Sequence, residues 1–459
     1  MRKIYIAPEK NTKLWRILIV GCALILLFSS SVFASPQINE ISSKEAVELA
    51  TFYYCCNTTE PVKFDQYTIT PLYDEEGSIT YYCVDFFNDG IGKGYVVIGQ
   101  NLNYLQCPEL ALDGNSWYYS NALSQSKTIY YNPFERYVQT TEENIYYDIS
   151  NQKIDKENID GSIYDGKLLE NRSILNNVDG VTSPADERDS FEVHPMVYLE
   201  NLGYTQISCT SYGTIETAMQ QANAFNPMYD IPSYGKLLTD GTRLRNSGHC
   251  AITAMANIFM YWKAQGAVPN APSSYDDMFT AVCNKACELG YFSKNKTYNA
   301  ITGQYENAGV YHGYVQEIMR EFARDYGSGS FNYSSNEADW DFLTWGIDAG
   351  WPIYLRFGHD NPMDTEDEFI YSYHATVAFG YNIMQAVGNS GFVSYKFAKL
   401  YDGWDSYEGI SSTGKRYIPW SALTNSVANI STDENGNVID HSIKVNMYII
   451  GPSTGESEW

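Results

Sequence analysis

Hydrophobic and polar positions follow two different periods along the first third of the chain. Residues 42–54 place apolar side chains at helical spacing, and Ser42 with Glu45 forms the capping box that starts many helices. Three runs of alternating apolar and polar residues follow, separated by polar glycine-containing turns: 67–73, 78–87 and 94–99. This order predicts a helix followed by an antiparallel meander over residues 36–148.

The pattern after residue 191 is different, because helical spacing comes first and strand-like alternation comes later. The segments with helical spacing are 250–263, 275–287, 314–323 and 340–348. The strand-like runs are 352–357, 373–382 and 392–404, with a hairpin turn at 433–439. Helices first and strands afterwards predict an α+β domain over residues 191–459, and not an alternating parallel sheet.

Residues 149–190 separate these two regions. This stretch is polar, rich in Asn and Asp and poor in aromatic residues, which is typical of an exposed linker. Exposed linkers are preferred sites of proteolytic cleavage. The alternative is a long ordered loop that wraps over one of the domains.

The first 34 residues have the pattern of a signal peptide. A basic segment precedes an apolar run at 17–28, which is too short to span a bilayer comfortably. Val32 and Ala34 then fit the small-residue rule for cleavage after Ala34. We therefore expect a secreted protein that has no membrane contact after cleavage. An uncleaved N-terminal anchor is the alternative.

The charge narrows the choice of partners. The formal net charge is −25, and removing five basic residues and one acid with the first 34 residues gives −25 − 4 = −29. Such a chain is a poor partner for nucleic acid or anionic membrane. Cys283 and Cys287 stand four residues apart on a predicted helix, but no second pair with metal-ligand spacing completes a site. We expect no metal and no cofactor.

Cys250 is the main candidate for chemistry, since it stands at the first turn of the predicted helix 250–263. The apolar stripe that buries this helix is formed by Ile252, Met255, Phe259 and Trp262. Backbone N–H groups and the dipole at a helix start stabilise a thiolate, so this position favours a nucleophile. His249 directly precedes Cys250, but adjacent side chains point apart, so we do not expect it to be the base. A buried structural thiol and a disulfide partner are the alternatives.

A nucleophilic cysteine needs a base that is near in space and usually far in sequence, and His374 is the candidate. On its predicted strand, His374 shares a face of small residues with Thr376, Ala378 and Gly380, opposite the bulky face formed by Ala375, Val377, Phe379 and Tyr381. Asp402 ends the next predicted strand. Antiparallel pairing would place it beside His374, where it could orient the imidazole. Trp404 would cover the pair. A core histidine and an ordinary turn aspartate are the alternatives.

The sequence GHCAITAMANIFMYW at 248–262 resembles the active-site helix of the streptopain-like cysteine peptidases, which belong to the papain-like superfamily. The matching residues are Gly248, His249, Cys250, Thr253, Ala254 and Tyr261. Residues 348–359 and 373–382 look like the strands that lead to and carry that family's histidine, and YDGW at 401–404 stands where the family has an Asn/Asp–Trp segment. Region 36–148, with GKGYVVIG, looks like the family's propeptide.

This resemblance implies a papain-like peptidase domain made as a zymogen, with its own propeptide as an intramolecular partner and a protein or peptide as substrate. It implies that Cys250 attacks, His374 transfers protons and Asp402 orients His374. One position departs from the family: Leu244 stands where a glutamine usually donates to the oxyanion, six residues before the cysteine. Asn246 is the nearest side-chain amide and is the oxyanion candidate. A missing donor costs about 10²–10³ in rate.

Two other functions remain open, and the departure at Leu244 motivates the first of them. One is a catalytically inactive papain-like module that serves binding or adhesion. The other is a different Cys–His–Asp acyl-transfer enzyme, such as an amidase, a transglutaminase-like enzyme or a processing peptidase related to the double-glycine leader peptidases.

Overall fold

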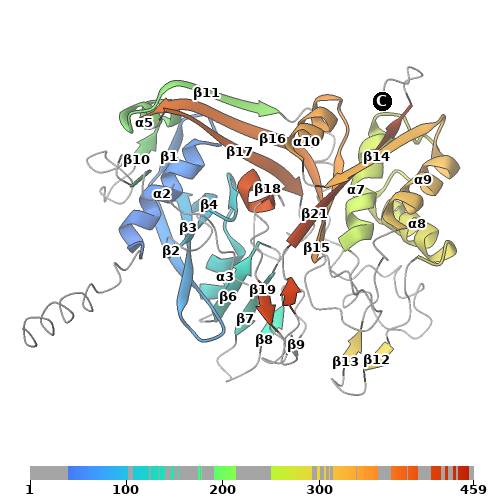
Figure 1. Cartoon of the computed structure of the whole chain (residues 1–459), viewed down its shortest axis with the longest axis horizontal. Helices are drawn as coiled ribbons and strands as arrows, with labels where there is room; N and C mark the ends of the chain where they lie inside the picture. The colour runs from blue at the N-terminus through green and yellow to red at the C-terminus, as the bar shows by residue number, and fades with distance from the viewer. Residues whose placement is uncertain are drawn as a thin grey trace, which may run out of the picture. The chain divides into compact units, whose positions relative to one another are not determined.

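The computed structural model describes most of the chain (Figure 1). The described residues are 40–101, 107–123, 126–133, 135–139, 146–148, 153–154, 174–175, 177, 191–212, 250–291, 297–299, 304–306, 310, 314–337, 339–359, 374–389, 391–401, 415–424, 430–432, 438–440 and 443–453. Those from Ile41 onward belong to one compact unit. The predicted signal peptide, 1–34, lies outside these ranges, as does most of the predicted linker. Among the described residues, no helix is both long and apolar enough to cross a membrane.

The N-terminal region contains the helix and the meander that the sequence predicts. Helix α2 (Ser43–Cys55) begins with the capping box: the Ser42 hydroxyl accepts from the Glu45 N–H at 3.2 Å, and the Glu45 carboxylate accepts from the Ser42 N–H at 2.8 Å. Strands β2 (Gln66–Tyr73), β3 (Ile79–Asn88) and β4 (Ile91–Gly99) pair in antiparallel order. The buried face of α2 packs against β3 and β4.

The later part of the chain contains the predicted helices and the predicted strands after them, but their order is not strictly helices first, because unpredicted strands at 191–193, 205–212 and 331–337 lie before or between the helices. The helices are α7 (Cys250–Ala264), α8 (Tyr275–Glu288), α9 (Val315–Tyr326) and α10 (Trp340–Asp348). The strands at the predicted positions are β15 (Ile353–His359), β16 (His374–Gly388) and β17 (Gly391–Tyr401). Strands β19 (Ile430–Thr432) and β20 (Val438–Asp440) pair on either side of the predicted hairpin turn. Both α7 and α10 pack against β16.

One mixed α/β architecture results, built on a large sheet. Its strand order is β14 (Phe331–Glu337), β21 (Ile443–Pro452), β15, β16, β17, β18 (Lys415–Pro419), β5 (Leu110–Ala111), β4, β3, β2, β6 (Lys127–Asn132), β7 (Glu135–Gln139), β8 (Tyr146–Asp148) and β9 (Lys153–Ile154), with β11 (Thr205–Tyr212) also paired to β16. All described pairings in this sheet are antiparallel except the contact between β2 and β6. The architecture is compatible with a peptidase fold.

The remaining elements complete the two regions. They are β1 (Val62–Phe64), α3 (Trp117–Leu123), β10 (Phe191–Val193), α5 (Pro195–Asn201), β12 (Thr297–Asn299), β13 (Gln304–Glu306) and α11 (Trp420–Thr424). In Figure 1, β16 and β17 run as a long hairpin from the side of α10 to the side of α2 and α5.

Candidate functional site

Helix α7 carries Cys250 at its first residue. The four residues of the predicted stripe are all buried, with 4% exposure or less. The helix is nevertheless buried on more than one face, since every residue from Ala251 to Phe259 is buried. A helix that is apolar all round belongs in a core. Cys250 is partly exposed and therefore sits where this core helix reaches the surface of the core.

Backbone N–H groups surround the Cys250 thiol. Burial raises the pKa of Cys250, while hydrogen bonds from the backbone N–H groups of Ala375, Ala251 and Cys250 itself lower it. The net direction is upward. The expected stabilisation of a thiolate by the helix start is therefore present, but burial outweighs it. A nearby cation would be needed to hold the thiolate at neutral pH.

The strand that carries His374 reaches the thiol. His374 is the first residue of β16 and pairs with Phe357 of β15. The next residue, Ala375, is one of the three whose backbone N–H donates to the Cys250 thiol, and it comes from outside α7. The structure therefore places Cys250 beside the backbone at His374. The described ranges leave out the side chain of His374.

The two faces predicted for this strand are interrupted by a bulge between Ala378 and Gly380. Residues on both faces are buried, including Thr376 at 1% exposure. The small face is therefore covered as well as the bulky one, and both α7 and α10 pack against the strand.

The third predicted residue follows β17 directly. Tyr401, the last residue of β17, pairs with Val377, three residues after His374. The end of one strand thus lies beside the start of the other, as the antiparallel prediction requires. Asp402 itself and Trp404 lie outside the described residues, and so does the segment with Leu244, Asn246 and His249.

Tyr354 is a neighbour of Cys250 that the sequence analysis did not single out. It is fully buried on β15, opposite Val377, and its ring packs edge-on against Tyr448 at 5.7 Å. Its hydroxyl makes no hydrogen bond within the described part of the chain. Burial and the nearby Cys250 raise the pKa of Tyr354. The sequence could not reveal that Tyr354 lies near Cys250, because a tyrosine within an apolar strand looks the same as an ordinary core residue.

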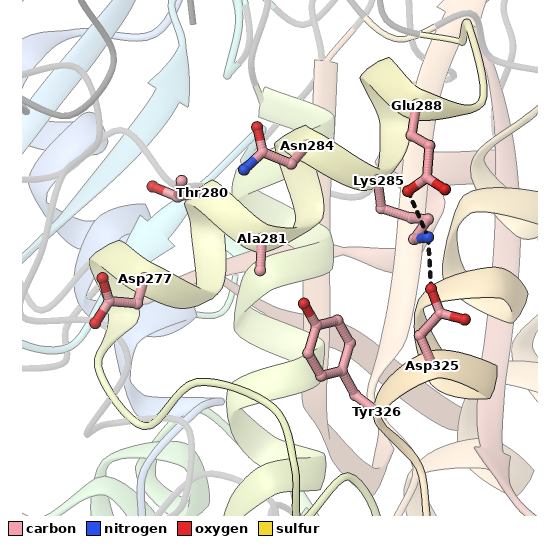
Figure 2. Close-up of a pocket in the computed structure, with 8 residues that line it drawn as sticks. All are labelled: Asp277, Thr280, Ala281, Asn284, Lys285, Glu288, Asp325 and Tyr326. Atoms are coloured by element: carbon pink, nitrogen blue, oxygen red, sulfur yellow. Dashed lines mark hydrogen bonds and ion pairs between the residues drawn. The ribbon is translucent and has the colours of Figure 1, made fainter. Parts of the chain in front are cut away.

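A separate polar hollow of about 370 Å³ lies between α8 and α9 (Figure 2). Lys285 bridges Glu288 at 2.7 Å and Asp325 at 2.5 Å there, so it ties the two helices together. The hollow is lined by Asp277, Thr280, Ala281, Asn284, Lys285, Glu288, Asp325 and Tyr326. None of these residues belongs to α7, β15 or β16, so the hollow is not the candidate active site.

The model of the Peptidase_C39 like family matches residues 228–423, less than half of the chain. The matched segment contains Cys250 and His374 as well as Asp402. No curated protein matches the chain. The family match supports a cysteine-type peptidase, which is a hydrolase. It does not extend to the streptopain-like subtype or to the propeptide.

Proposed function

We propose that the chain is a secreted cysteine endopeptidase made as a zymogen, with Cys250 as its nucleophile. The observation that carries this proposal is the placement of the Cys250 thiol, at the start of α7, against the N–H of Ala375. That contact brings together two segments that are more than a hundred residues apart. The same two segments lie within the matched peptidase family.

In the proposed mechanism, His374 takes the thiol proton and Cys250 attacks the scissile carbonyl carbon as a thiolate. The new S–C bond gives a tetrahedral oxyanion, for which the Cys250 N–H and the Asn246 side chain are the proposed donors. The C–N bond then breaks as His374 protonates the leaving amine. Water, deprotonated by His374, hydrolyses the thioester and restores the thiol. Asp402 orients His374, and Trp404 shields the pair from water.

The proposal of secretion and latency rests on the sequence. Residues 1–34 have a signal-peptide pattern, the charge suits a soluble exported protein, and region 36–148 precedes a polar linker. The substrate would be a protein or peptide. No metal or other cofactor enters the proposed reaction.

A second candidate is another Cys–His–Asp acyl-transfer enzyme, including a processing peptidase. The family match favours keeping it, because that match is to a Peptidase_C39 like family and not to the streptopain relatives. The two candidates differ in substrate and share the nucleophile. An inactive binding module would have no selectively reactive Cys250.

The deciding experiment is alkylation by iodoacetamide at about pH 6, where ordinary thiols are protonated and slow. Selective labelling of Cys250, found by peptide mapping, is expected. Cys287, also partly buried at its position on α8, is the matched internal comparison. Equal labelling of the two thiols would contradict the enzyme proposal. A second assay measures cleavage of unfolded protein substrates, with Cys250→Ala as the inactive control. Cleavage that is lost in this variant is expected of an endopeptidase and not of an acyl-transfer enzyme with narrower specificity.

A further inference from the structure

The hydrophobic core around α2 is formed by residues of the N-terminal region together with residues from later in the chain. The ring of Phe52 packs against Tyr204 at 5.8 Å and against Tyr395 of β17 at 5.3 Å. Met384 and Phe397, from the distal half of the β16–β17 hairpin, are buried in the same core. Taking the N-terminal region away would expose these apolar side chains to water.

The backbone also joins the two regions. Strand β18 pairs with β5 through Tyr417 and Leu110, and β5 pairs with β4. Strand β10, which follows the predicted linker, pairs with β1, which precedes it. A cut anywhere in the linker would therefore leave strand pairings across the break.

Buried polar groups cross the same boundary. Arg416 of β18 donates to the Glu109 carboxylate at 2.6 Å, and both side chains are at most 3% exposed. Asn382 of β16 donates through Nδ2 to the backbone oxygen of Asn57 at 3.1 Å and to its side-chain oxygen at 3.2 Å. Separating the regions would remove a close partner of each buried charge, and breaking a buried ion pair is among the most costly changes to a protein interior.

We propose that residues 41–148 stay bound after any cleavage in the linker, so that the mature peptidase is a noncovalent two-chain protein. This inference rests on the proposed zymogen function and specifies where the N-terminal region goes after the zymogen is cut. The N-terminal region is then a structural subunit and not an inhibitor that departs.

The β16–β17 hairpin connects residues 41–148 to the candidate active site. β16 begins at His374, beside Cys250, and its later residues Met384 and Ala386 lie in the core around α2. The strand that delivers His374 is thus anchored at its far end by the N-terminal region. Loss of that region would leave the hairpin without the core that holds it.

The test uses the full chain with a recognition sequence for a specific protease inserted between residues 155 and 173. After complete cutting, the two fragments are run on a gel-filtration column in native buffer and again in concentrated urea. We expect one peak at the uncut volume in native buffer and two peaks in urea. Two peaks in native buffer would overturn the inference.

Substitutions on α2 test which contacts hold the fragments together. Phe52→Ala in the cut protein should raise fragment dissociation at least about tenfold, because it empties the ring contacts that cross the boundary. Lys44→Ala, on the exposed side of the same helix, should leave it unchanged. Equal dissociation of the two variants would contradict the proposed interface. If Phe52→Ala does not fold, the cut chain without substitutions decides alone.

Labelling of Cys250 in the cut protein separates the two proposals. Co-elution without selective labelling contradicts the peptidase and leaves the two-chain structure supported. Separate elution with selective labelling contradicts the two-chain structure and leaves the peptidase supported.

Discussion

Glu109 is the anion of a fully buried charge cluster, and replacing it is the most direct test of the described core. Its carboxylate lies 2.6 Å from Nη1 of Arg416 and 3.6 Å from Nη1 of Arg136, and all three side chains are at most 3% exposed. The hydroxyls of Tyr118 and Tyr95 also donate to it. Glu109→Gln keeps the size and one acceptor oxygen but removes the carboxylate charge that faces both of these buried guanidinium groups.

The expected loss follows from this geometry. Breaking one buried pair by removing one partner costs about 3–5 kcal/mol, because the remaining charge is uncompensated. Glu109 faces two buried cations, so the expected loss lies toward the upper end of this range. The amide oxygen of Gln can still accept hydrogen bonds, and this offsets part of the loss. We expect the free energy of unfolding to fall by about 4 kcal/mol, a large share of the roughly 5–15 kcal/mol of a typical protein.

The assay is urea unfolding, followed by tryptophan fluorescence, with the midpoint and the slope m measured for each variant. Lys44→Gln is the control, because Lys44 is 58% exposed and lies 3.6 Å from Glu48, so we expect a change of at most about 1 kcal/mol. The double variant Glu109→Gln with Arg416→Met should lose less than the sum of the two single losses. A Glu109→Gln loss no larger than that of Lys44→Gln would refute the buried cluster.

Two further predictions concern buried groups elsewhere. Burial raises the pKa of Asp85 to about 6, above its ordinary 3.8, despite hydrogen bonds from Ser116 that lower it. The folded state therefore holds this proton more tightly than the unfolded state, so Asp85 should make stability rise as pH falls from about 7 to about 4, by at most about 3 kcal/mol. Asp85→Asn should flatten that slope in thermal unfolding, and an unchanged slope would contradict the assignment. Tyr354→Phe removes a buried hydroxyl that has no hydrogen bond among the described residues, so stability should stay level or rise by about 1 kcal/mol. Tyr118→Phe loses hydrogen bonds to Glu109 and Arg136, so it should instead lower the free energy of unfolding by about 1–3 kcal/mol. Equal losses in Tyr354→Phe and Tyr118→Phe would contradict this reasoning.

Local signals in the sequence were sufficient for the longer helices and for several of the longer strands. Ser42 and Glu45 predict the start of α2 because a capping box needs only residues three apart. The bounds of α10, Trp340–Asp348, agree with the predicted 340–348, where Asp339 caps the helix through its side chain. Hydrophobic periodicity and helix caps depend only on residues that are close in sequence, so a single sequence is enough to detect them.

Long-range partners could not be predicted in the same way. Glu109 and Arg416 are 307 residues apart, and a single charged residue beside an apolar strand has no period that reveals its burial. The pairing of β18 with β5 depends on one residue pair, Tyr417 with Leu110. Cys250 shows the same limit: its place at a helix start is visible in the sequence, but the burial that raises its pKa is not.

The long hairpin explains why both kinds of information are needed at the site. β16 has its first residues in the core that contains α7 and its later residues in the core that contains α2. A strand rises about 3.3 Å per residue, so its 15 residues span roughly 50 Å between these cores. Pairing with β15 fixes the register near His374, and pairing with β11 fixes it in the distal half. A one-residue slip at either end would exchange the faces of every side chain on the strand. The backbone position of His374, next to Ala375 and the Cys250 thiol, is therefore set by contacts in both regions, and the segment that matches the family model alone does not determine it.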